Sequence, residues 1–69
     1  MSLSLTVNGE TRASAAATVA ALLEEENVPL EAKGVAVALN GAVVRKTEWH
    51  ATPLAAGDSV EIVKPCSGG

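Results

Sequence analysis

The residues best suited to chemistry are the last two of the sequence, Gly68 and Gly69. With nothing after it, Gly69 is expected to carry a free α-carboxylate, and neither glycine has a Cβ. We expect the pair to extend, to enter a narrow slot in a partner and to present an unhindered carbonyl for attack. This ending predicts a reactive terminal group that a folded body holds out toward other proteins.

The two residues before this group, Cys66 and Ser67, complete a predicted flexible tail over residues 66–69. At ~3.5 Å per residue, four extended residues reach about 14 Å. Cys66 is the only cysteine, which excludes an internal disulfide. A relay through its thiol would need a fixed base or cation nearby, and only Lys64 is close in the sequence. We therefore interpret Cys66 as an incidental exposed thiol.

The size and composition of the chain exclude several classes of function. A chain of 69 residues buries only ~60% of the surface that its unfolded form exposes, which leaves no room for an active-site cleft beside a core. The five basic residues are scattered and the net charge is -3, which disfavours nucleic-acid binding. No apolar run reaches ~18 residues and no signal-peptide pattern is present, so we expect no membrane association. The single cysteine favours a reducing cytoplasm.

The first half of the sequence predicts a hairpin and then a helix. Residues 3–7 alternate between apolar and polar, as in a half-buried strand, and Asn8-Gly9 is a strong hairpin signal before a return strand over 10–13. Thr18 is a candidate N-cap for a helix over 19–27. The acidic run Glu24 to Glu26 is expected to be a solvated face of this helix.

The second half predicts three further strands. Residues 35–40 form an apolar run typical of a central strand, and Asn40-Gly41 is a second hairpin signal before a short strand at 43–44. A final strand follows the turn at Gly57-Asp58 and ends at Pro65, which has no N–H to donate.

The segment between these strands holds the only aromatic residue and the only histidine. We interpret Trp49 as a partial core plug. His50 has no second histidine or cysteine cluster to help bind a metal, so we interpret it as a solvated loop residue and expect no metal site.

The order strand, strand, helix, strand, short strand, strand predicts one helix that covers one face of a small mixed sheet. The first and last strands would then lie side by side and parallel at its centre. This arrangement is an α+β fold, the ubiquitin-like β-grasp, with four to five strands packed on one helix. We expect the domain to span 1–65 and the flexible tail to follow it.

Short motifs that follow one another in a fixed order point to a family. They are Val7-Asn8-Gly9, residues 18–23, residues 35–41, Val43-Val44-Arg45, Trp49, residues 57–63 and Gly68-Gly69. In this order, over essentially the whole chain, they resemble the sulfur carrier proteins of thiamin biosynthesis (ThiS-like). The resemblance implies a protein cosubstrate and not an enzyme, without a catalytic residue or a bound cofactor of its own.

The resemblance also implies the partners and the chemistry of Gly69. A ubiquitin-activating-like enzyme would adenylate the Gly69 carboxylate with ATP and magnesium. Sulfur from a donor such as a cysteine desulfurase would displace AMP and leave a thiocarboxylate. Thiazole synthase would then take the sulfur for thiamin. On its own the carrier is expected to be a cytoplasmic monomer.

Two questions stay open in the sequence. Ala36, Ala38, Val44 and Val63 are expected to form an apolar sheet face on which a partner docks, with ordinary exposed residues as the alternative. The small subunit of molybdopterin synthase, another sulfur carrier such as one for cysteine synthesis, and a ubiquitin-like protein modifier are alternative functions. The shortness of the chain favours the thiamin branch.

Overall fold

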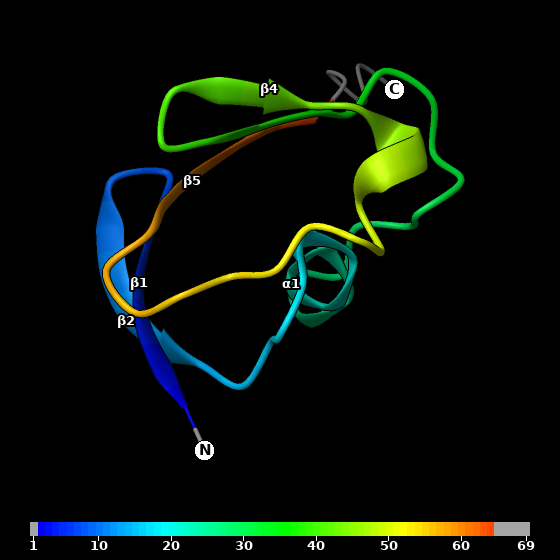
Figure 1. Cartoon of the computed structure of the whole chain (residues 1–69). Coiled ribbons are helices and arrows are strands. Elements are labelled where there is room, and N and C mark those ends of the chain that lie inside the picture. The colour runs from blue at the N-terminus through cyan, green and yellow to red at the C-terminus, as the bar shows by residue number, and fades with distance from the viewer. Residues whose placement is uncertain (1, 65–69) are drawn as a thin grey trace.

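The computed structural model describes residues 2–64, in which a curved sheet holds one α-helix against one of its faces (Figure 1). The elements within this range are β1 (Leu3–Val7), β2 (Glu10–Ser14), α1 (Val19–Glu25), β3 (Ala36–Leu39), β4 (Ala42–Val44), the 3₁₀ helix η1 (Lys46–Glu48) and β5 (Ser59–Val63). The strands lie in the order β2-β1-β5-β3-β4, with β1 and β5 parallel at the centre. The predicted α+β β-grasp fold is confirmed.

Both predicted Asn-Gly hairpins form. Asn8 and Gly9 have φ angles of 51° and 85°, and Asn40 and Gly41 have 51° and 87°. Two consecutive residues with positive φ match the right-handed twist of paired strands, and asparagine and glycine adopt this conformation most readily. The first hairpin pairs Leu3 with Ser14, so β2 is one residue longer than predicted.

Helix α1 begins as predicted. The Thr18 side chain accepts a hydrogen bond from the Ala21 N–H at 3.2 Å. The N–H groups of Val19 and Ala20 donate to the carbonyls of Thr52 and Trp49 at 3.0 Å each. The segment after η1 therefore satisfies the first helical donors, which have no partner within the helix.

Helix α1 ends at Glu25, earlier than the predicted end at residue 27. Asn27 takes a left-handed conformation with a φ of 60°, its N–H donates to the Glu24 carbonyl, and the Val28 N–H donates to the Leu23 carbonyl. These two bonds make a Schellman motif, which ends the helix before Pro29 is reached. Val28 then lies buried in the core.

The core lies between α1 and the inner face of the sheet. Its buried members from the strands are Leu5, Val7, Val37, Val60 and Ile62, and those from the helix are Val19, Ala20, Leu22 and Leu23. Trp49 completes it with an exposed fraction of 2%, and its Nε1–H donates to the Val44 carbonyl at 3.0 Å. Trp49 is therefore fully part of the core rather than a partial plug.

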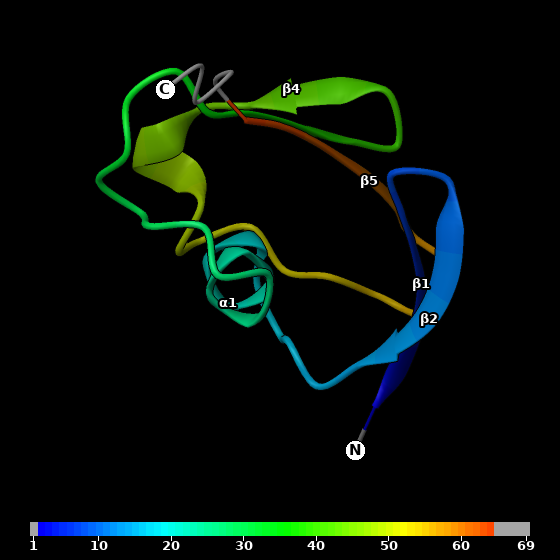
Figure 2. The ribbon, with the colours of Figure 1, turned by 180° about the vertical axis from the view of Figure 1, so that it is seen from behind.

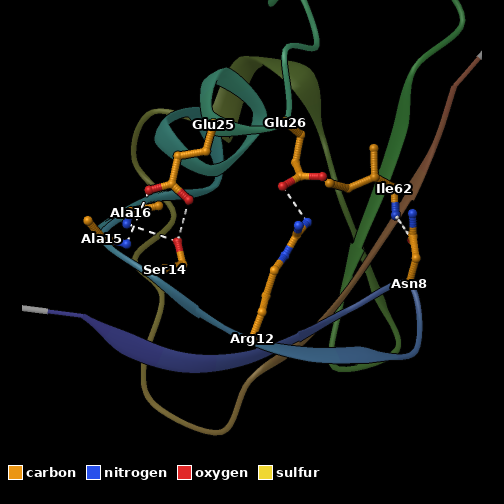
Figure 3. A network of polar contacts seen from close by, with 8 residues as sticks. All are labelled: Asn8, Arg12, Ser14, Ala15, Ala16, Glu25, Glu26 and Ile62. Atoms are coloured by element: carbon orange, nitrogen blue, oxygen red, sulfur yellow. Dashed lines mark hydrogen bonds and ion pairs between the residues drawn. The ribbon is translucent and has the colours of Figure 1, made fainter.

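The end of α1 is fastened to β2 by polar contacts (Figure 3). The Ser14 hydroxyl donates to Glu25 Oε1 at 2.7 Å and accepts the Ala16 N–H at 3.0 Å. Arg12 forms an ion pair with Glu26. The prediction of a solvated face holds for Glu24 and Glu25, which are exposed, whereas Glu26 is half-buried. The contacts with β2 were not predicted; they form because Arg12 and Ser14 lie on the inner face of β2, opposite the helix.

Replacement of Ser14 by alanine is expected to lower the free energy of unfolding by about 1–3 kcal/mol, because it removes both hydrogen bonds and leaves the buried Ala16 N–H without its acceptor. Urea denaturation followed by circular dichroism measures the change. Glu24→Ala on the exposed side of the helix is the control, with an expected change within about 0.5 kcal/mol. Equal stability of S14A and wild type would show that this contact contributes nothing.

Candidate functional site

The predicted sulfur-carrying residue Gly69, with Cys66, Ser67 and Gly68 before it, lies outside the described residues. The structure describes instead the strand that leads to this group. Strand β5 lies between β1 and β3, and its inward residues Val60 and Ile62 are buried. The chain that precedes the predicted tail is thus a central strand of the sheet, paired on both sides.

The start of β5 is held by the turn between β3 and β4. The Asn40 N–H donates to the Ser59 carbonyl at 2.7 Å, and the Ser59 N–H donates to Asn40 Oδ1 at 2.9 Å. Asn40 Nδ2 also donates to Asp58 Oδ1 at 3.1 Å. Asp58 in turn accepts the Ala55 N–H at 2.8 Å, which confirms its interpretation as a turn former.

The other Asn-Gly turn holds β5 near its far end. Asn8 Oδ1 accepts the Ile62 N–H at 2.7 Å, across 54 residues of sequence (Figure 3). The sequence indicated Asn8 and Asn40 as turn residues only, and their contacts with β5 were not predicted. The shared Asn-Gly motif is the signal that could have drawn attention to the pair, but the strand order is needed to see that both turns border β5.

Helix α1 lies on one side of the curved sheet (Figure 2), and mostly apolar residues of β3, β4 and β5 lie on the other side. Ala36 lies opposite Val63, and Ala38 lies opposite Glu61 on one side and Val43 on the other. We call these five residues the outer patch. Its two valines are the most exposed large hydrophobic residues among residues 2–64, at 80% for Val43 and 61% for Val63.

The predicted docking face is wrong in one member. Val44 lies opposite Val37, whose side chain is buried under the helix, so Val44 belongs to the inner face. Val43 takes its place on the outer patch. A two-residue turn at Asn40-Gly41 pairs Leu39 with Ala42, and alternation along a strand then places Val43 outward. The register that the Asn40-Gly41 turn predicts was therefore enough to place Val43 on the outer face.

Residues 2–64 offer few other candidate sites. Within this range no pocket forms, and no three His, Cys, Asp or Glu residues come together as metal ligands would. No helix in the same range is long and apolar enough to cross a membrane. His50 is exposed in the turn after η1.

A comparison with protein families decides the membership of the chain. The profile described as the ThiS family matches residues 5–69, which include both terminal glycines. The chain belongs to the ThiS family. Among curated protein sequences, none matches significantly.

Solved structures of ThiS proteins agree with this membership. The crystal structure of the thiamine biosynthesis protein ThiS from Geobacter metallireducens is 36% identical, covers 100% of both chains and superposes with a TM-score of 0.75. The solution structure of a thiamine biosynthesis protein from the same organism is also 36% identical, with a TM-score of 0.79, and the match covers 97% of this chain and 88% of that one. At this identity the likeness extends beyond the fold to the sequence of the family.

Proposed function

We propose that this protein carries sulfur for thiamin biosynthesis on the carboxylate of Gly69. One observation carries the proposal: the ThiS family match runs through Gly68 and Gly69, the residues that the chemistry requires. The thiamine biosynthesis proteins of Geobacter metallireducens, similar over nearly the whole chain, support the same pathway. The protein acts as a cosubstrate, and the catalytic groups belong to its partners.

The proposed chemistry starts from an unreactive group. A carboxylate does not acylate a sulfur nucleophile at neutral pH, because oxide is a very poor leaving group. A ubiquitin-activating-like enzyme, with ATP and magnesium, transfers AMP to the Gly69 carboxylate and releases pyrophosphate. The outer sulfur of a persulfide, formed by a donor such as a cysteine desulfurase, then attacks the acyl carbon and AMP leaves, which gives an acyl disulfide. A second thiol attacks the donor sulfur of this S–S bond, forms a disulfide with it and releases the thiocarboxylate. The resulting thiocarboxylate is the group that thiazole synthase consumes.

The outer patch is the surface that we propose for docking on the activating enzyme. Its valines are exposed and Glu61 is the only charged residue among its five members.

Replacement of Val43 by aspartate is expected to raise the KM for the carrier in ATP–pyrophosphate exchange by about 10-fold or more, since a carboxylate would be buried without a partner. Val43 is a better position for this substitution than Ala38, because a carboxylate at position 38 would lie opposite Glu61 and repel it even in the free protein.

Ala13→Asp is the matched control for this prediction. Ala13 lies opposite Ser4 on the same outer face, but on β2 at the other edge of the sheet. It receives the same charge at a comparably exposed position, and we expect its KM to stay within about 2-fold of the wild-type value. Equal KM values for V43D and wild type would remove the outer patch from the docking surface.

The acceptor pathway is tested by a comparison of two enzymes that consume a thiocarboxylate. The loaded carrier is offered to thiazole synthase and, separately, to the large subunit of molybdopterin synthase, and sulfur transfer to each product is measured. We expect transfer with thiazole synthase alone. Transfer only to the molybdopterin precursor would assign the protein to that pathway instead.

A further inference from the structure

Strand β5 extends beyond the strand that pairs with it on one side. The β1–β5 ladder advances in steps of two residues: the Thr6 N–H donates to the Asp58 carbonyl and the Asn8 N–H to the Val60 carbonyl, both at 2.9 Å. At the next step, the Ile62 N–H needs an acceptor on the β1 side. The chain has by then turned away, because Asn8 already has a φ of 51° and starts the hairpin.

The side chain of Asn8 supplies the missing acceptor. Its Oδ1 receives the Ile62 N–H at 2.7 Å and so replaces the main-chain carbonyl of a longer β1 (Figure 3). Asn40 does the same at the start of β5, where its Oδ1 receives the Ser59 N–H in place of its own carbonyl. In both turns an asparagine Oδ1 thus replaces a main-chain acceptor, on opposite sides and at opposite ends of β5.

We propose that Asn8 is a positioning residue for sulfur loading: its amide oxygen fixes the last residues of β5 and thereby the direction in which the chain continues toward Gly69. The inference rests on the proposed function. It extends that function, because it assigns a role in presenting the Gly69 carboxylate to Asn8, a residue near the other end of the sequence. On its other side β5 is paired with β3 as far as Val63, and Lys64 is the last residue that the structure describes before the tail.

The proposed role predicts a separation of kinetic constants. Docking through the outer patch does not involve Asn8, so its loss should leave the KM for the carrier nearly unchanged. A less constrained end of β5 would place the Gly69 carboxylate correctly in a smaller fraction of docked complexes, which lowers kcat. Variants of the outer patch should show the opposite pattern, with KM raised and kcat retained.

The test compares three variants in ATP–pyrophosphate exchange with the activating enzyme. Asn8→Gly removes the acceptor and keeps the positive φ without strain. Asn40→Gly removes the corresponding acceptor at the start of β5, together with the hydrogen bond to Asp58, and is the matched control. Asn8→Asp keeps an oxygen acceptor for the Ile62 N–H. We expect kcat to fall by about 3- to 10-fold in N8G, the size that one net hydrogen bond supports, and to stay within about 2-fold of wild type in N40G and N8D.

Amide hydrogen exchange gives a readout that does not depend on the function. In N8G the Ile62 amide should exchange faster by a similar factor while the Val60 amide keeps its protection. A wild-type kcat in N8G, an equal fall in N40G, no recovery in N8D, or an unchanged Ile62 amide would each overturn the inference. A wild-type protein that the activating enzyme does not adenylate would instead overturn the proposed function, and the exchange result would still report on the Asn8 contact.

Discussion

A chain that lacks Gly69 is expected to form the thiocarboxylate at least about 100-fold more slowly than the full chain. The deletion leaves a carboxylate on Gly68, which is chemically the same group, but shortens the reach of the chain by ~3.5 Å. Misplacement of a reacting atom by as little as 1 Å can cost about 100-fold in rate. The measurement is single-turnover loading with activating enzyme, ATP and a sulfur source.

Cys66→Ser is the control for the deletion, since it alters the tail without changing its length or its terminal carboxylate. We interpret the thiol as incidental, so this variant should load sulfur at a rate within about 2-fold of wild type. Full loading of the chain without Gly69 would contradict the assignment of the carrier group. A large loss in the serine variant would instead give Cys66 a part in sulfur transfer.

Replacement of Trp49 by alanine should destabilise the fold more than any other single change considered, by about 3–5 kcal/mol. The indole is 2% exposed and is the largest of the fully buried side chains. Its Nε1–H also ties the core to β4 through the Val44 carbonyl. Because small domains have only ~5–15 kcal/mol of stability in total, a loss of this size approaches the unfolding threshold.

Urea denaturation followed by circular dichroism measures this effect, since the variant has no tryptophan fluorescence. Trp49→Phe is the control: it keeps an aromatic ring in the cavity and loses mainly the hydrogen bond and part of the volume. We expect Trp49→Phe to lower the free energy of unfolding by less than half as much as Trp49→Ala does. A change below about 1 kcal/mol for W49A would show that the core does not depend on the indole.

The local signals in the sequence were strong enough to predict most of the fold. The Asn-Gly pairs require positive φ at two consecutive residues, and the Thr18 hydroxyl caps the helix as expected. Each of these signals acts between residues close in the sequence. The parallel placement of β1 beside β5 is confirmed, and the connection from β2 through α1 to β3 passes over these two central strands.

The parts that could not be predicted depend on contacts between distant segments. Helical periodicity places Glu25 and Glu26 away from the core, but it does not say that β2 lies close enough to bind them. In the same way, nothing near Asn8 in the sequence indicates a contact with Ile62. Val44 is a different case: it lies on the inner face and not on the predicted outer face, and the register of the predicted hairpin was sufficient to show this.

The central claim is that the last carboxylate of this protein is loaded with sulfur, and intact-mass spectrometry tests it most directly. The protein is incubated with the activating enzyme, ATP, magnesium and a sulfur source, and its mass is recorded with and without ATP. We expect an ATP-dependent gain equal to the exchange of one oxygen for one sulfur, located on Gly69 by fragmentation. An unchanged mass, or a mass joined to another protein through a lysine, would contradict the claim.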